Sequence, residues 1–276
     1  MANLVYMAKS AWTGLLDSIR AKAGTAASMT VSEATTAVQN IPTGGGGGEE
    51  YEQLVTRTIS AASGSMSKIG AYAFTSCPKL TTVSFPAATV IGAYAFASCS
   101  KLTTASITAA TIIESSAFYN CTSLTTASFP AVTEIGAFAF TYCSKLTTVS
   151  FPAATVLSSN AFHNCLSLTT VSFPAATEIG NSAFYACMRL TTASIPAATG
   201  IGNNAFRSCY NLTSLYLTGG SMAQLSNANA FSSTPISNNT ASTGGVYGSI
   251  FVPASLYDSY ISAANWSVYS SRFVSV

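Results

Sequence analysis

The chain has 276 residues, of which only 7 % are charged, and its formal net charge is +2. A typical soluble domain has roughly 25 % charged residues. Because no block of Lys and Arg stands out, the sequence argues against a nucleic-acid partner. No apolar run reaches the ~18 residues of a membrane-spanning helix, and residues 1–9 do not have the pattern of a secretory signal peptide. We therefore expect no membrane insertion, and if the protein lies outside a cell, either another route exports it or a leading segment has been trimmed from this sequence.

Residues 1–43 differ in pattern from the rest of the chain and are expected to form a helical hairpin. Lys9 to Lys22 suits a short helix, and Thr30 with Glu33 forms a capping box that opens a second helix running to about Asn40. Residues 44–50, with five glycines at 44–48, are expected to be a flexible linker. These glycines are not a phosphate-binding loop, because no Lys-Ser/Thr pair follows them.

The front segment also carries a resemblance. Leu15 to Lys22, followed by Gly24-Thr25 and Met29-Thr30, is similar to a small N-terminal module of phage and prophage tail-associated proteins. The resemblance implies an attachment module that docks on virion components and so a location on the virion. A helical hairpin without any docking role is the alternative.

A strict 22-residue period dominates the middle of the chain. Seven cysteines recur at this step from Cys77 to Cys209, as do phenylalanines from Phe74 to Phe206 and leucines from Leu80 to Leu212. The unit reads Ile-Gly-x-x-Ala-Phe-x-x-Cys-x-x-Leu-Thr-Thr-Val-Ser-Phe-Pro-Ala-Ala-Thr-x. This period and its L-x-x-L-x-L spacing predict a leucine-rich-repeat solenoid over residues 51–230, whose stacked rungs bury a continuous core.

Each repeat predicts one strand and one turn. The β-branched and aromatic stretch Thr-Thr-Val-Ser-Phe alternates in polarity, so Val83 and Phe85 are expected inside and Thr82 and Ser84 outside. Such strands would form one parallel sheet. Residues 70–77 have the 3–4-residue apolar spacing of a short helical or 3₁₀ turn, which is expected on the opposite face.

The two ends of the solenoid must be capped, because an open strand edge recruits other chains. Residues 51–60 are predicted to be an irregular first strand. Residues 231–276 are predicted to be an α/β C-terminal cap, with a strand at 250–253, a helix from Ala254 to Ala264 and a final strand near 272–274. Trp266 is expected to close the core at that end.

The Ile-Gly, Ala-Phe-x-x-Cys and Leu-Thr-Thr-Val elements resemble the BspA-like leucine-rich repeats of bacteria, gut phages and some protists. The segment from Phe251 to Ser267 is similar to the usual C-terminal cap of that family. The resemblance covers residues 51–276. It implies the solenoid fold and a role like that of its members, most of which are described as adhesins or surface proteins without a defined ligand.

No catalytic, cofactor or metal site is expected. The cysteines should be buried free thiols that point the same way into the core, since no C-x-x-C pair exists and their number is odd. His163, the only histidine, occupies a variable slot and is expected to face solvent. Glu114, Glu134 and Glu178 are expected to be a solvated edge near the Ile-Gly turns. Without a paired base or nucleophile, no acid–base constellation can be assembled.

The two exposed faces differ in variety. The outward strand pairs repeat Thr and Ser in every rung, whereas the slots of the opposite face change from rung to rung. Aromatic side chains with Ser and Asn are the composition of adaptable binding surfaces. The candidate ligand-binding residues are Tyr72, Tyr94, Tyr119, Phe138, Tyr142, Tyr185 and Tyr210. The alternative is that these exposed positions have no function, in which case random sequence drift would produce the same variety.

These observations predict a non-enzymatic binding or adhesion module, foremost a phage tail-associated or virion-surface recognition protein. The alternatives are a bacterial cell-surface adhesin and a structural spacer or decoration protein without its own ligand. Ice binding by the Thr-x-Ser array is a further alternative, disfavoured because such sheets curve. The expected partners are a glycan or protein on a cell surface, and a homo-oligomer is compatible with the sequence.

Overall fold

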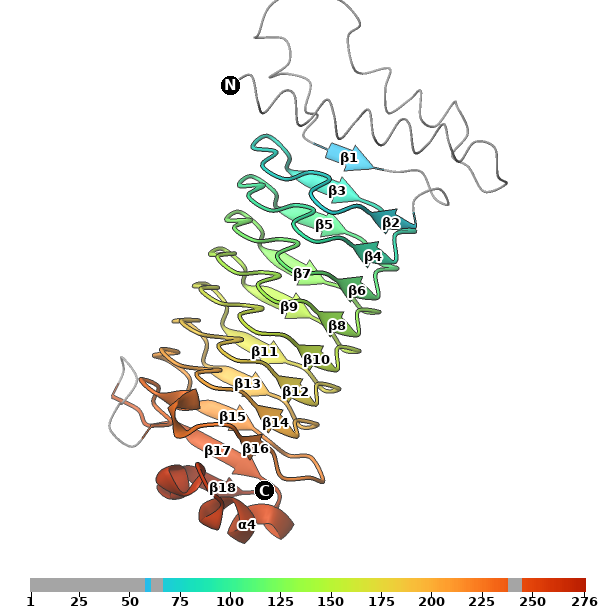
Figure 1. Cartoon of the computed structure of the whole chain (residues 1–276). Helices are drawn as coiled ribbons and strands as arrows, with labels where there is room; N and C mark the ends of the chain where they lie inside the picture. Colours follow the sequence, from blue (N-terminus) through green and yellow to red (C-terminus); the bar gives the residue numbers. More distant parts are fainter. Residues whose placement is uncertain (1–57, 61–66, 238–244) are drawn as a thin grey trace, which may run out of the picture.

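The computed structural model describes residues 58–60, 67–237 and 245–276. From residue 67 onward the chain winds into a stack of similar rungs that runs from the β2 end to the C-terminal cap (Figure 1). The predicted helices of residues 1–43, the linker of residues 44–50 and most of the predicted first strand lie outside the described residues.

Each rung contributes one short strand with its polar residues outward. In β3 the Val83 side chain is fully buried and that of Phe85, just after the strand, is 2 % exposed, as the alternation predicted. Most neighbouring strands pair in parallel, for example Thr82 with Thr104, and they form three short sheets rather than one continuous sheet. These strands are β1 (Thr58–Ser60), β3 (Thr82–Ser84), β5 (Thr104–Ser106), β7 (Thr126–Ser128), β9 (Thr148–Ser150), β11 (Thr170–Ser172), β13 (Thr192–Ser194) and β15 (Ser214–Tyr216).

The sequence predicted strands on one side of each rung only, but a further parallel sheet lies along a second side. It consists of eight two-residue strands at the positions read as Ile-Gly turns, each with its second residue buried. The prediction of a turn was wrong at these positions. The residue before the Gly, usually a β-branched Ile, is held in an extended conformation by backbone hydrogen bonds to the neighbouring rungs, so a short strand forms before the chain turns. The strands are β2 (Lys68–Ile69), β4 (Val90–Ile91), β6 (Ile112–Ile113), β8 (Glu134–Ile135), β10 (Val156–Leu157), β12 (Glu178–Ile179), β14 (Gly200–Ile201) and β16 (Gln224–Leu225).

The third side of each rung is a chain of tight turns, not the expected helical turn over residues 70–77. Tyr72 and Ser76 have φ values of +58° and +56°, whereas α- and 3₁₀-helices need negative φ at every residue. The amide N–H groups of alternate residues, such as those of Tyr72 and Phe74, donate to carbonyls of the next rung at 2.9 and 2.7 Å. The backbone is therefore satisfied between rungs rather than along a helix.

The core between the three sides is a stack of equivalent side chains. Phe96, Phe118 and Phe140 lie with ring centroids 5.2 and 5.1 Å apart, and the same contact continues through Phe206 to Phe231. Such offset aromatic pairs add about 0.5–1.5 kcal/mol each beyond their buried area. One rung thus gives the next an almost identical apolar template.

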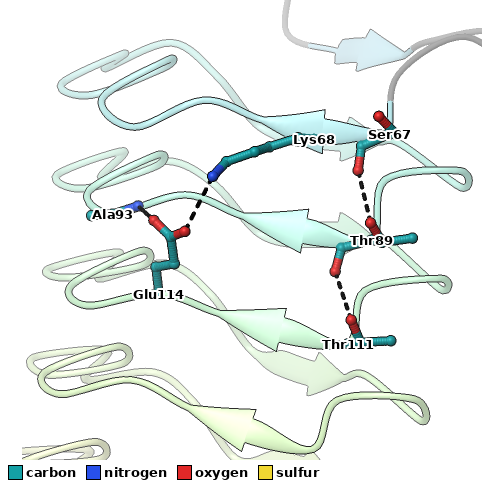
Figure 2. Close-up of polar contacts among 6 residues, drawn as sticks. All are labelled: Ser67, Lys68, Thr89, Ala93, Thr111 and Glu114. Atoms are coloured by element: carbon teal, nitrogen blue, oxygen red, sulfur yellow. Dashed lines mark hydrogen bonds and ion pairs between the residues drawn. The ribbon is translucent and has the colours of Figure 1, made fainter.

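Threonine hydroxyls add a hydrogen-bond ladder at the border between the two sheets. Thr89 Oγ1 donates to the Ser67 carbonyl at 3.0 Å, and Thr111 Oγ1 donates to the Thr89 carbonyl at 3.2 Å (Figure 2). The same bond recurs at each rung as far as Thr199. A second ladder runs through the first threonine of the Leu-Thr-Thr element, for example from Thr103 Oγ1 to the Thr81 carbonyl at 3.0 Å.

The C-terminal residues close the last rung (Figure 1). The Ala223 N–H donates to the Tyr260 hydroxyl, Trp266 Nε1 donates to the Ala223 carbonyl, and Asn265 Nδ2 donates to the Leu225 carbonyl, each at 2.8 Å. Trp266 is 1 % exposed, in the place expected for it. The elements here are η1 (Ala228–Phe231), β17 (Ser249–Val252), η2 (Ala254–Leu256), α4 (Tyr257–Ser262), η3 (Ser267–Arg272) and β18 (Phe273–Ser275).

Candidate ligand-binding face

The face formed by the turns, called the turn face here, comprises residues 72–76 and their equivalents in later rungs. Its backbone carries positive φ, between 54° and 62°, at the first and last of these positions in every rung from Tyr72 to Ser208. β-Branched residues are strongly disfavoured at positive φ. In agreement, these positions hold only Tyr, Phe, Ser, Asn and Ala: Tyr72, Ser76, Tyr94, Ser98, Ser116, Asn120, Phe138, Tyr142, Asn160, Asn164, Ser182, Ala186, Asn204 and Ser208.

The structure brings three of the predicted aromatic residues into one row and adds a fourth member. The ring centroids of Tyr119 and Tyr142 are 5.6 Å apart, those of Tyr142 and His163 5.7 Å, and those of His163 and Tyr185 5.0 Å. The four rings belong to four consecutive rungs. Tyr142 is 41 % exposed and the other three are half-buried. We call this set the aromatic row.

The remaining predicted residues do not join the row. Tyr72 and Tyr94 stack on each other nearer the β2 end, with centroids 5.0 Å apart and planes 2° from parallel. Phe138 and Tyr210 are exposed, and within the described ranges no ring packs against either. The seven candidates therefore form one pair, one row and two isolated rings.

His163 does not face solvent freely, as its variable slot had suggested. Its ring is half-buried between two tyrosines, its Nε2 lies 3.3 Å from Asn164 Nδ2, and burial lowers its pKa. The equivalent Thr141 is 1 % exposed, and its hydroxyl donates to the Asn160 carbonyl at 2.6 Å. The slot varies because small residues turn inward there while rings lie along the surface. In the sequence, aromatic residues fill this slot in three of four neighbouring rungs, and that pattern could have predicted the aromatic row.

The exposed residues of the three-residue strands of the repeats, called the strand face here, offer hydroxyl groups only. From β5 to β11 their Thr and Ser side chains are exposed in every strand. The strand face therefore presents the same chemistry at each rung.

The three candidate acids lie on or beside the short strands, called the short-strand face, and only two of them form a solvated edge. Glu134 and Glu178 are exposed. Glu114 is half-buried and occupies a slot that is Gly in most rungs. Its carboxylate accepts a hydrogen bond from the Ala93 N–H at 2.8 Å and pairs with Lys68 Nζ at 3.3 Å (Figure 2).

The thiols are free, and six of the seven are buried. Each buried Sγ donates to the carbonyl of a core phenylalanine one rung earlier, as Cys121 does to Phe96 at 3.1 Å. Burial raises the pKa of Cys121 to about 12 and that of Cys143 well above the ordinary thiol value. Cys77, at the β2 end, is only half-buried, and a hydrogen bond with Cys99 lowers its pKa.

Within the described ranges, no three His, Cys, Asp or Glu side chains come together in a way that would hold a metal ion. Nor does any helix there have the length and apolar character to cross a membrane. What the geometry offers is a set of surfaces: a varied turn face with an aromatic row, a uniform strand face and a short-strand face with acids.

The stacked rungs, their two parallel sheets and the Leu-x-x-Val-x-Phe spacing define a leucine-rich-repeat protein. Residues 51–155 and 133–246 match the family described as BspA type leucine rich repeat region, in six copies. The chain belongs to this family, as its repeat residues predicted.

Comparison with solved structures gives further similarities. A leucine-rich cell surface protein from Faecalibacterium prausnitzii is 28 % identical, with a TM-score of 0.48, over 58 % of this chain and 54 % of that one. The chain thus spans about half the length of that relative. The T. pallidum leucine-rich-repeat protein is 24 % identical, with a TM-score of 0.48, over 56 % of this chain and 77 % of its own. No curated protein matches the chain. The family match begins at residue 51, so the resemblance of residues 1–43 to tail-associated modules stays a prediction.

Proposed function

We propose that this chain is a non-enzymatic adhesion module of a bacterial cell surface and that it binds its ligand on the turn face. The observation that carries the proposal is the aromatic row, which places four rings on consecutive rungs of a surface that also presents Ser and Asn side chains. Family membership supports the class of function, because most proteins with these repeats are described as adhesins or surface proteins. Nothing in the proposal requires a reacting group.

The turn face is favoured over the strand face for a physical reason. Specific recognition needs a surface that differs from place to place, with a few aromatic anchors that contribute ~1 kcal/mol or more each. The exposed Thr and Ser of β5 to β11 repeat without change. The turn face holds aromatic, amide, hydroxyl and basic side chains within a few rungs.

The test compares matched substitutions on the two faces. Changing Tyr119, Tyr142 and Tyr185 together to Ser removes the tyrosines of the row. Ser occupies the slot of Tyr142 in other rungs, and the slot of Tyr119 and Tyr185 holds the similarly small Thr or Ala elsewhere, so the fold should remain. We expect binding of the purified protein to immobilised epithelial cells, mucin and matrix proteins to fall at least about tenfold. Loss of ~1.4 kcal/mol of binding free energy from the three rings together corresponds to a factor of ten.

The control changes Thr126, Thr148 and Thr170 to Val on the strand face, where all three are exposed. Binding should stay within about twofold of the original protein, because surface substitutions of this kind perturb stability little. If the Val variant loses binding and the Ser variant keeps it, the ligand site lies on the strand face. If the unmodified protein binds none of these surfaces, a structural spacer becomes the better description.

A second candidate, a virion-surface recognition protein, is supported by the similarity of residues 15–30 to tail-associated modules. In that case residues 1–43 dock on virion components, and the turn face meets the host. Immunogold labelling distinguishes the two locations, because a virion protein labels phage tails and an adhesin labels the cell envelope. Neighbouring genes give the same distinction, tail genes in one case and sortase or secretion genes in the other.

A further inference from the structure

We propose that the ligand of the turn face is an acidic polysaccharide that carries a negative charge on alternate sugars. In this assignment the aromatic row contacts consecutive sugar rings, and a line of cations beside it pairs with the acids. The inference rests on the proposed function and names the ligand chemistry of that same face.

The aromatic row matches a chain of sugar rings in spacing and in chemistry. Its centroids advance by 5.0 to 5.7 Å from one rung to the next, which is close to the advance per sugar of an extended polysaccharide. The C–H face of a sugar packs against an aromatic ring, and the phenol hydroxyl of Tyr adds a polar edge. Amide groups of Asn120 and Asn164 lie at the slot beside the rings and suit sugar hydroxyls.

Basic side chains line the corner where the turns meet the strand face. Lys79, Lys101, Lys145 and Arg189 occupy the same slot, three residues after the turn face ends. From Lys101 to Lys145 and from Lys145 to Arg189 the step is 44 residues, twice the 22-residue repeat. With rungs spaced by the ~4.8 Å of neighbouring strands, this step is roughly 10 Å, the order of length of one disaccharide. Along the four rungs of the row, two cations, Lys145 and Arg189, thus accompany four rings, and Lys101 lies one rung before the row.

Charge is segregated around the solenoid. Over residues 67–237 the acids are Glu114, Glu134 and Glu178, at the short strands or directly after them, where Glu114 is paired with Lys68. Among the described residues, the slots of the turn face and its corner hold no Asp or Glu, while Lys101, Lys145 and Arg189 are exposed there and Arg207 extends the positive charge one rung beyond Tyr185. At physiological ionic strength charges act over ~8 Å. The acids on the short-strand face therefore leave the corner a locally positive edge.

A polysaccharide fits this surface better than a protein does. Protein hot spots are fully desolvated pockets near the centre of an interface, whereas the row is a single file of rings, half-buried or exposed, between polar side chains. The strip is narrow and offers one ring per rung, with neighbouring ring planes at 86°, 44° and 76° to each other. One ring per rung suits a ligand that repeats along its length, and the changing tilt presents ring edges as well as ring faces to it. From Lys101 onward a cation alternates with a neutral residue at the corner, whereas Lys79 and Lys101 stand in consecutive rungs. The alternating part, which lies beside the aromatic row, selects the charge pattern of the ligand.

The first experiment measures binding of the full chain to two probes by calorimetry. Hyaluronan oligomers carry a carboxylate on alternate sugars, and chitin oligomers of equal length carry none. We expect hyaluronan to bind at least about tenfold more tightly, and we expect its affinity to fall as salt rises. Equal affinity for the two probes, or no binding of hyaluronan, overturns the inference.

The second experiment locates the cations. Changing Lys101, Lys145 and Arg189 together to Gln should reduce hyaluronan affinity at least tenfold while leaving the circular dichroism spectrum unchanged. The matched control, Glu134→Gln with Glu178→Gln, removes charge from the short-strand face and should leave affinity within about twofold, because those acids lie on a different side. Equal losses in both variants would show a general charge effect and reject the site.

Failure of the ligand assignment is distinguishable from failure of the proposed function. If the Tyr119, Tyr142 and Tyr185 to Ser variant loses binding to cell envelopes but hyaluronan does not compete for that binding, the adhesion site stands and the acidic polysaccharide is rejected. If that variant binds envelopes as the original protein does, the proposed function falls, and this inference falls with it.

Discussion

The turn face and the strand face are both exposed, yet they obey different constraints. On the strand face, extended backbone accepts many side chains, but every strand from β3 to β13 keeps Thr and Ser. On the turn face the positive φ at two slots per rung excludes β-branched residues, but the residues that remain vary in size and chemistry. The face with the stricter backbone is therefore the one with the more diverse chemistry.

This difference shows that variation between rungs is not a measure of backbone freedom. The slot of Tyr142 accepts Ser, Asn, Ala or Tyr because each can adopt a left-handed conformation at modest cost. The slot of His163, where φ is not positive, accepts Thr as well. The hydrogen bonds between rungs hold the backbone of the turn face at positive φ, and the side chains there vary only among residues that tolerate this conformation.

The largest expected effect comes from removing the end of the stack, because both faces exist only while rungs remain paired. Deleting residues 246–276 exposes the Ala223 N–H and the carbonyls of Ala223 and Leu225, which now bond to the cap. It also uncovers Phe231, which packs against Trp266 and Tyr269. Each orphaned polar group costs about 1–3 kcal/mol. We expect the truncated protein to aggregate and to lose cooperative thermal unfolding in calorimetry.

Deleting residues 1–48 is the matched control for the other end. The glycine linker predicted at residues 44–50 separates that segment from the repeats, so the midpoint of thermal unfolding should shift little. A soluble, cooperatively unfolding chain that ends at residue 245 would contradict the role assigned to the cap.

The 22-residue period was sufficient to predict the core but not the backbone of the turns. Val83, Phe85 and the phenylalanine ladder are buried where the pattern placed them. The turns of residues 70–77 were misread because Ala73, Phe74 and Cys77 have the spacing of one helical turn. A positive φ usually attracts glycine, and neither special slot holds one. The available signal was the complete absence of Val, Ile and Thr from those slots.

Candidate site residues were predicted as a list and not as an arrangement. Periodicity places Tyr119 and Tyr185 in one slot and Tyr142 in the next, and only the fold shows that these two slots meet across neighbouring rungs. His163 was set aside because a variable slot was equated with a solvent-exposed one. Glu114 was misassigned for a different reason, since its partners lie one and two rungs away and depend on how the rungs are stacked.

The buried thiols beneath the turn face predict loss of stability at alkaline pH. The pKa values of Cys121, Cys143, Cys165 and Cys209 are higher in the folded chain than in the unfolded one, and that of Cys121 reaches about 12. The stabilising neutral form of these thiols is therefore fully present only below the unfolded value near 9. As pH rises from 9 towards 12 the unfolded chain releases protons first, and the free energy of unfolding falls by about 1.4 kcal/mol per unit of pKa difference for each thiol.

Urea denaturation under reducing conditions at pH 7, 8 and 10.5 measures this loss. The midpoint should change little between the first two values and fall clearly at the third. A Cys121→Ala variant should show a shallower decline, since one titrating thiol is gone. A midpoint that stays constant to pH 10.5 would mean that the thiols are not held neutral in the core.

A smaller effect compares the backbones of the two faces directly. Ser208 has a φ of +61°, so Ser208→Val forces a β-branched residue into the left-handed region and should cost about 1–3 kcal/mol. Thr170→Val on the strand face should remain within about 0.5 kcal/mol of the original protein. Urea denaturation of both variants provides the measurement. Similar costs at the two sites would remove the distinction drawn between the faces.

The smallest effect concerns the short-strand face and separates the two bonds of Glu114. The Glu114→Gln substitution keeps an oxygen that accepts from the Ala93 N–H but loses the ion pair with Lys68. In that pair the Lys68 side chain is 55 % exposed and the Glu114 side chain is 35 % exposed. Solvent screens such a pair, so the loss should be less than about 1 kcal/mol. Glu114→Ala also leaves the Ala93 amide without its acceptor and should cost about 1 kcal/mol more. High salt should abolish the Gln difference while the additional Ala cost persists, because only the ion pair is screened. If salt reduced both losses equally, the carboxylate would act through charge alone, and its bond to the Ala93 amide would contribute nothing to the stacking of the rungs.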